Sequence, residues 1–369
     1  MASPLQINLP VMLHFEKEVQ AFLEAKRRIE TLGDSYDVPI DVGAFLLYLP
    51  NHARNPGSFE AQIENQRKHR LPIRLAETGV EGANGLSYGE GDPTYNPEKP
   101  SDMEKVIEQV AKLRDLDKNP LENLVVAPQV GILVADTDRS SFLNPCFYSH
   151  GYFVNHRDKL FNRARGRFSK LKRLAEEKGL TLALENALLA QFEDSDYWHT
   201  LTSQDSETTT NFALDYGAFN DFNSLMTISQ RSLVFDVAHF AAEANTQRQF
   251  EANGVKPGRL FATMEISSWQ EYHEAVGNMN DYLTHARAIH LSQVEGIGLR
   301  LAGTEEAERW GGGGALPPLI PVETQRSVLR FAQEKGLPVS LEPEYSLKPS
   351  LTYKEADDLL EPILRIYNS

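Results

Sequence analysis

The sequence predicts a single (β/α)8 barrel, an α/β fold in which eight parallel strands alternate with helices. Four short apolar runs in the second half of the chain each end in a carboxylate or an imidazole: Glu185, Asp236, His290 and Glu342. Successive members of this set are 51, 54 and 52 residues apart. Each interval suits one strand–helix unit with long loops, in a fold that usually needs ~250 residues before insertions.

The side chains within these runs alternate in size, which supports their assignment as strands. Residues two apart share one face of a strand, so each polar residue shares its face with a small or β-branched neighbour. These neighbours are Ala183, Val234, Ala288 and Ser340. Larger apolar residues such as Phe235 and Leu341 take the opposite face, which we expect to pack outward on helices. The polar residues then lie at the C-terminal ends of the strands, where catalytic groups of this fold are found.

The remaining elements follow from apolar runs separated by turn residues and amphipathic segments. The expected strands span residues 9–15, 39–47, 71–77, 123–129, 180–185, 233–236, 288–291 and 337–341. The clearest helices span residues 16–31, 101–116, 155–178 and 353–367, and another ends near residue 70. Ser101 is a favourable N-cap, and Gly33 and Gly179 follow helix ends. We expect one domain over residues 1–369, with long loops at 79–100, 187–216 and 303–320.

Composition narrows the class of protein. The chain is 41% hydrophobic and 24% charged, with a formal net charge of −15. That charge disfavours polyanionic partners, so no nucleic acid is expected. One cysteine excludes an internal disulfide, and we find neither a signal peptide nor a membrane span, so a cytoplasmic protein is expected. A basic run at 163–173 could bind phosphate or nucleic acid, but the solvated face of a barrel helix is the more ordinary interpretation.

The order strand-Glu, strand-Asp-x-x-His, strand-His, strand-Glu resembles the xylose isomerase-like TIM-barrel superfamily. That group holds sugar isomerases and epimerases, myo-inositol catabolic enzymes and apurinic endonucleases. The likeness is carried by four segments of the second half: Leu-Glu-Asn186, Phe-Asp-Val-Ala-His239, Ile-His290-Leu and Leu-Glu-Pro343. The first four strands match as architecture only.

The resemblance to the ketose 3-epimerase branch implies a role for each of these residues. The matching Glu, Asp, His and Glu bind one divalent metal there, and the two glutamates also move a proton. Carried over, the implied metal ligands are Glu185, Asp236, His290 and Glu342, and the implied catalytic residues are Glu185 and Glu342. His239 is then expected to contact substrate or a second metal. Trp198, Arg300 and His14 are further candidates for substrate contacts.

Two departures from the family pattern affect these expectations. The seventh-strand motif usually continues with an acidic residue and a nearby arginine, but here Ser292 and Gln293 follow, and the next arginine is Arg300. The nuclease branch needs extra histidines at the ends of strands three and four. Glu77 and Gln129 stand there instead, which disfavours apurinic-endonuclease activity.

The sequence therefore favours a divalent-metal-dependent isomerase or epimerase acting on a sugar, polyol or related hydroxy-carbonyl through an enediolate. Three carboxylates with one imidazole suit Mn²⁺, Mg²⁺ or Co²⁺ better than Zn²⁺. Taken singly, each residue could be an ordinary salt-bridged or capping residue; the four together favour a metal site. The alternative is a barrel of the same superfamily with changed chemistry, as a lyase, a hydrolase or a non-catalytic binding protein. Membrane partners are not expected, and a homo-oligomer is left open.

Overall fold

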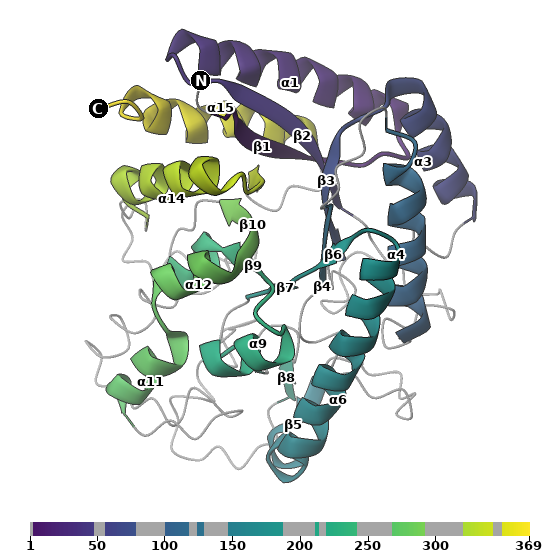
Figure 1. Cartoon of the computed structure of the whole chain (residues 1–369), viewed down its shortest axis with the longest axis vertical. Helices are drawn as coiled ribbons and strands as arrows, with labels where there is room; N and C mark the ends of the chain where they lie inside the picture. The colour runs from purple at the N-terminus through teal and green to yellow at the C-terminus, as the bar shows by residue number, and fades with distance from the viewer. Residues whose placement is uncertain are drawn as a thin grey trace.

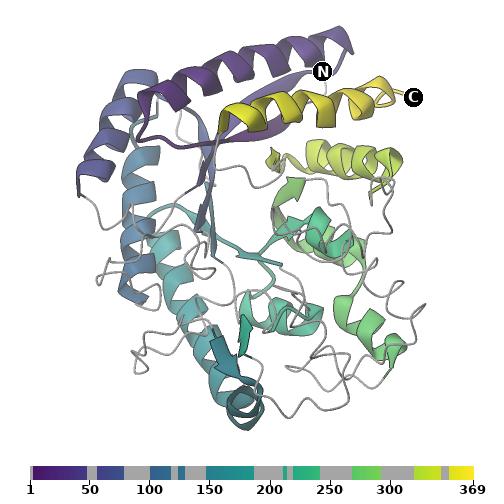
Figure 2. The ribbon, with the colours of Figure 1, turned by 180° about the vertical axis from the view of Figure 1, so that it is seen from behind.

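The protein is described by a computed structural model in which a ring of helices surrounds a central group of strands (Figures 1 and 2). The described residues are 3–47, 56–78, 100–117, 124–128, 147–186, 211–213, 219–241, 268–291, 320–341 and 349–369.

The central strands pair in parallel in one continuous sheet. They are β1 (Leu5–Val11), β2 (Ile40–Leu47), β3 (Ile73–Thr78), β4 (Val125–Pro128), β6 (Thr181–Leu182), β7 (Leu184–Glu185), β9 (Leu233–Asp236), β10 (Ala286–Leu291) and β11 (Val339–Leu341). Their order is β6-β4-β3-β2-β1-β11-β10-β9-β7. Strands from the two ends of the chain are neighbours, since β1 pairs with β11.

The sheet closes into a barrel through the segment 181–185. Ala183 alone separates β6 from β7, and β6 pairs with β4 while β7 pairs with β9. The Ala183 N–H donates to the Val126 carbonyl at 3.0 Å, and the Leu184 N–H donates to the Ser232 carbonyl at 2.9 Å. One strand therefore joins both edges of the sheet, and the predicted (β/α)8 barrel is confirmed.

The helices of the described chain pack on the outside of this barrel (Figures 1 and 2). They are α1 (Glu16–Ser35), α3 (Pro56–His69), α4 (Pro100–Arg114), α6 (His150–Glu177), α9 (Phe222–Ile228), α11 (Trp269–Val276), α12 (Met279–His285), α14 (Val322–Lys335) and α15 (Pro349–Arg365). None of the helices in these described ranges is long and apolar enough to cross a membrane.

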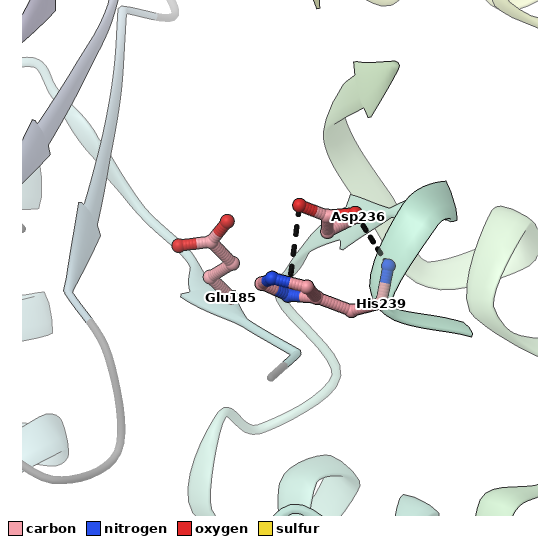
Figure 3. Close-up of side chains that lie close together, drawn as sticks. All are labelled: Glu185, Asp236 and His239. Atoms are coloured by element: carbon pink, nitrogen blue, oxygen red, sulfur yellow. Dashed lines mark hydrogen bonds and ion pairs between the residues drawn. The ribbon is translucent and has the colours of Figure 1, made fainter. Parts of the chain in front are cut away.

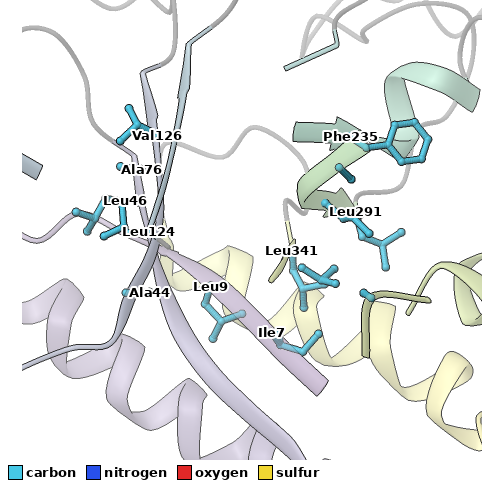
Figure 4. Close-up of a cluster of buried hydrophobic side chains, with 14 of the residues drawn as sticks. Ile7, Leu9, Ala44, Leu46, Ala76, Leu124, Val126, Phe235, Leu291 and Leu341 are labelled. Carbon is cyan, nitrogen blue, oxygen red and sulfur yellow. The ribbon is translucent and has the colours of Figure 1, made fainter. Parts of the chain in front are cut away.

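The predicted alternation of inward and outward residues is confirmed. The barrel interior holds a small apolar cluster that includes Ala183, Val234, Ala288 and Phe45. A larger cluster lies between the outer faces of the strands and the helices, and Figure 4 draws part of it, including Phe235, Leu291 and Leu341. The interior is therefore filled by apolar side chains, and the polar strand-end residues lie above them at the rim.

The first strand lies earlier than predicted. The prediction of a strand over 9–15 is wrong at both ends, because β1 spans Leu5–Val11 and the Phe15 N–H donates to the Met12 carbonyl at 3.1 Å in a turn. The polar residue Asn8 obscured the pattern. Its side chain points into the barrel, where its Nδ2 donates to Ser340 Oγ at 3.3 Å.

Part of the predicted loop 187–216 forms a strand. Residues 211–213 make β8 (Asn211–Ala213), which pairs antiparallel with β5 (Phe147–Ser149). Both strands belong to connections that leave the C-terminal ends of barrel strands, β5 after β4 and β8 after β7. The β5–β8 pair therefore joins the connection after β4 to the connection after β7. The rest of that loop, and the predicted loop residues 79–99 and 303–319, lie outside the described residues.

The basic run lies on α6, which packs on the barrel through Leu160, Ala164, Phe168, Leu171 and Ala175. Its charged side chains are exposed or half-buried; for example, Lys170 Nζ lies 2.5 Å from Glu104 Oε1 on α4. This arrangement supports the interpretation as a solvent-facing helix.

A glycine midway along β2 permits a close approach of buried polar groups. A Cβ on Gly43 of β2 would lie 2.8 Å from Asn8 Oδ1 and 2.9 Å from Arg74 Nε. The buried Arg74 guanidinium donates to the Asp41 carbonyl at 2.8 Å and pairs with the Asp41 carboxylate. Burial lowers the pKa of Arg74, and the nearby Asp41 charge opposes that shift.

We predict that Gly43→Ala destabilises the fold by about 1–3 kcal/mol, because the added methyl group must displace buried polar atoms. Gly166→Ala is the matched control. Gly166 lies within α6, and a Cβ there would meet no atom within 4 Å. Alanine should therefore stabilise the helix by about 0.5–1 kcal/mol. Chemical denaturation of both variants measures the two changes; a Gly43→Ala protein as stable as wild type would contradict the prediction.

Candidate metal centre

Three of the predicted ligands lie together at one rim of the barrel. Glu185 ends β7, Asp236 ends β9, and His290 lies near the end of β10. Their relative exposures are 1%, 2% and 0%. The strands β7, β9 and β10 are consecutive neighbours, and His290 is the register partner of Asp236. Glu185 is the register partner of Val234, which shares a face of β9 with Asp236, so the three side chains lie on the same face of the sheet at one rim.

The Asp-x-x-His spacing has a local structural cause. Residues 237–241 turn into a helix immediately after β9, and Asp236 caps that turn. Its Oδ1 accepts from the His239 N–H at 2.9 Å, the bond of a helix N-cap to its third residue. The same turn brings the imidazole back, so that His239 Nδ1 lies 3.5 Å from Asp236 Oδ2. A separation of three residues therefore allows both the backbone N–H and the imidazole of His239 to contact the Asp236 carboxylate.

Glu185, Asp236 and His239 form a compact donor group (Figure 3). One ligand atom from each lies within 4.8 Å of the others, and all three residues are buried. Two buried carboxylates this close repel each other and lose hydration, which is costly unless a positive charge compensates. A divalent cation would supply that charge, so the residues present fit a metal ion.

His290 adds a second imidazole beside this group. Its Nδ1 lies 2.9 Å from Glu185 Oε1, and its ring lies 5.3 Å from the Phe45 ring, centroid to centroid. Two donors that bind one ion at about 2.1 Å each, at right angles, are themselves ~3 Å apart. The Glu185–His290 spacing therefore suits two ligands of one ion.

Asn186 forms hydrogen bonds with two members of the donor group, Asp236 and His239. The sequence did not indicate this role. Its side-chain Oδ1 accepts from the Asp236 N–H at 2.8 Å, and its Nδ2 donates to the Asp236 carbonyl at 3.0 Å. Its own carbonyl accepts from His239 Nδ1 at 2.9 Å. The only signal in the sequence is that an amide directly follows Glu185 at the end of a strand.

The other predicted site residues have different outcomes. Glu342, Trp198 and Arg300, together with Ser292 and Gln293, lie outside the described residues. His14 lies in the turn between β1 and α1, at the same end of the barrel as the donor group. It is half-buried, burial lowers its pKa, and its ring centroid lies 3.9 Å from that of Phe15. Its expected substrate contact stays a prediction.

Comparison with known proteins gives distant structural similarity. No family model matches the chain, and no curated protein matches it. A xylose isomerase domain protein from Planctomyces limnophilus is 10% identical with a TM-score of 0.45, covering 99% of this chain and 98% of that one. The D-psicose 3-epimerase from Clostridium cellulolyticum, solved with D-tagatose, is 10% identical with a TM-score of 0.43, covering 98% and 96%. A xylose isomerase-like TIM-barrel protein from Mycobacterium smegmatis, in complex with magnesium, is 14% identical with a TM-score of 0.42, covering 100% and 98%.

Proposed function

We propose that this protein is a divalent-metal-dependent isomerase or epimerase acting on a sugar, a polyol or a related hydroxy-carbonyl compound. The observation that carries the proposal is the buried donor group of Glu185, Asp236 and His239, whose ligand atoms lie within 4.8 Å of one another. It lies at the C-terminal rim of a (β/α)8 barrel, the end at which such barrels bind substrate.

The proposed site holds one cation between Glu185 and Asp236, with imidazole donors available from His290 and His239. Glu342, the fourth ligand that the sequence resemblance implies, completes the proposed set. Oxygen-rich donors with imidazole favour Mn²⁺, Mg²⁺ or Co²⁺ over Zn²⁺. When bound, such an ion polarises a substrate carbonyl and stabilises negative charge on its oxygen.

The residues of the chain have distinct roles in this proposal. Glu185 removes a proton from the substrate carbon or returns one, with Glu342 as the partner base on the other face. His290 Nδ1 lies 2.9 Å from Glu185 Oε1, which places this imidazole beside the carboxylate at the rim. The apolar interior beneath, formed by residues such as Phe45, Val234 and Ala288, leaves little room for water below the reacting atoms. Trp198, Arg300 and His14 stay candidates for substrate contacts.

The same donor group is compatible with a second class, a metal-binding barrel with changed chemistry, such as a lyase, a hydrolase or a binding protein. The departure at Ser292 and Gln293 motivates this alternative. A DNA-repair nuclease is disfavoured, because a net charge of −15 opposes binding to a polyanion. We expect a small-molecule partner; a cytoplasmic location stays a prediction, and a homo-oligomer is left open.

We predict that Glu185→Gln and Asp236→Asn each weaken Mn²⁺ binding by at least about tenfold, because each removes one buried negative charge from the site. Isothermal titration of the purified protein, stripped with a chelator, measures the affinity. Glu104→Gln is the matched control, since Glu104 pairs with Lys170 on the protein surface, away from the rim. Equal Mn²⁺ affinity in all four proteins would remove Glu185 and Asp236 from the site.

Metal binding should also stabilise the fold without any substrate. An ion that binds only the folded state adds about 2.7 kcal/mol when its concentration is 100 times Kd. We therefore expect Mn²⁺ to raise the Tm of the wild type and to raise that of Asp236→Asn much less. Scanning calorimetry with and without chelator makes the comparison. An identical rise in both proteins would place the ion elsewhere.

The proton transfer separates the two proposed classes. With Mn²⁺ present, an isomerase or epimerase should exchange a carbon-bound hydrogen of its substrate with solvent deuterium, and Glu185→Gln should abolish that exchange. Mass spectrometry of a panel of ketoses and inositol derivatives incubated in D₂O measures the exchange. Metal binding without exchange in any compound would favour the binding protein or the changed chemistry.

A further inference from the structure

Asn186 continues the pairing between β7 and β9 with its side chain. The backbone ladder weakens at this point, since the Asn186 N–H reaches the Val234 carbonyl at 3.4 Å. Two residues further along β9, the amide side chain makes the next bonds between the two strands. It accepts from the Asp236 N–H at 2.8 Å and donates to the Asp236 carbonyl at 3.0 Å. The amide therefore binds both backbone groups of Asp236, which the backbone of a neighbouring strand would otherwise bind.

The backbone of Asn186 contacts His239, a second member of the donor group. Its carbonyl lies 2.9 Å from His239 Nδ1. A carbonyl only accepts hydrogen bonds, so Nδ1 carries the hydrogen in this contact. In the neutral imidazole, Nε2 is then the nitrogen with a lone pair, the form that binds a metal ion.

Burial makes these contacts rigid. Asn186 is 3% exposed, Asp236 is 2% exposed and His239 is 5% exposed. Buried hydrogen-bonding groups that lose a partner cannot replace it readily with water, so each of the three contacts is costly to break. Both polar side-chain atoms of Asn186 bond the backbone of Asp236, so the residue acts on the donor group through its neighbours.

We propose that Asn186 is the positioning residue of the metal centre: it holds Asp236 with its side chain and selects the tautomer of His239 with its carbonyl. This inference rests on the proposed metal site and adds a residue to it that does not touch the ion. Its effect is on affinity, because a ligand that is already oriented binds more tightly than one that must be ordered.

Asn186→Asp and Asn186→Ala test the proposal in complementary ways. Aspartate keeps the size but replaces the donating NH₂ group with an oxygen that faces the Asp236 carbonyl. Alanine removes both side-chain bonds. Ser232→Ala is the matched control, because the buried Ser232 Oγ donates to the Leu182 carbonyl at 2.8 Å and links β6 to the residue that precedes β9. All three variants lose a buried cross-strand bond; two of them lose it at the site.

The experiment measures the Mn²⁺ Kd of the full chain by isothermal titration, with Tm as the measure of general damage. We expect both Asn186 variants to bind Mn²⁺ ~10- to 100-fold more weakly than the wild type, in line with the loss of other groups that orient ligands. Ser232→Ala should lower the Tm and leave the Kd unchanged. An unchanged Kd in Asn186→Asp, or an equal loss in Ser232→Ala, would overturn the positioning role while the metal site itself stands.

A second measurement separates failure of this inference from failure of the proposed function. If the wild type binds no Mn²⁺, the proposed function fails, and ¹⁵N NMR of the metal-free protein still tests the tautomer. We expect His239 to be protonated on Nδ1 in the wild type and in Asn186→Ala, because the alanine keeps the backbone carbonyl that accepts from Nδ1. A wild type protonated on Nε2 would overturn the inference.

Discussion

The closure of the barrel by residues 181–185 is the constraint on which the rest of the structure depends. Five residues pair with β4 at one end and with β9 at the other, and the two hydrogen-bond ladders meet at Ala183. Its small side chain points into the interior cluster. Because Glu185 is the last residue of this segment, the strand that closes the barrel also fixes the height of the carboxylate at its rim.

The buried charges follow from this geometry. Glu185 and Asp236 end neighbouring strands, so parallel pairing brings two carboxylates together at a buried rim. Each carboxylate also has an imidazole beside it: His290 contacts Glu185, and His239 contacts Asp236. Near the N-terminal ends of β2 and β3, a buried charge is compensated by a residue of the protein itself. There a guanidinium, Arg74, pairs with Asp41, and the arrangement needs no added ion. At the rim, two buried carboxylates lie close together, which is why a cation is expected there.

The sequence predicted the barrel well because its main signal is local. Alternation of small inward and large outward residues can be recognised within one strand, and the 51- to 54-residue spacing relates one strand to the next. The first strand was misplaced because Asn8 points inward, and its partner Ser340 is 332 residues away. The function of Asn186 was missed for the same reason, since its bonds depend on the register between β7 and β9. Glu342, Arg300 and Trp198 rest on the resemblance alone.

The central claim is that one divalent ion binds between Glu185, Asp236 and an imidazole at the rim of the barrel. Anomalous diffraction from crystals of the wild type grown with Mn²⁺ tests it most directly. The account predicts a single strong peak within coordinating distance, about 2.0–2.2 Å, of both carboxylates and of His239 or His290. A rim without a peak in crystals that hold Mn²⁺ elsewhere would contradict it.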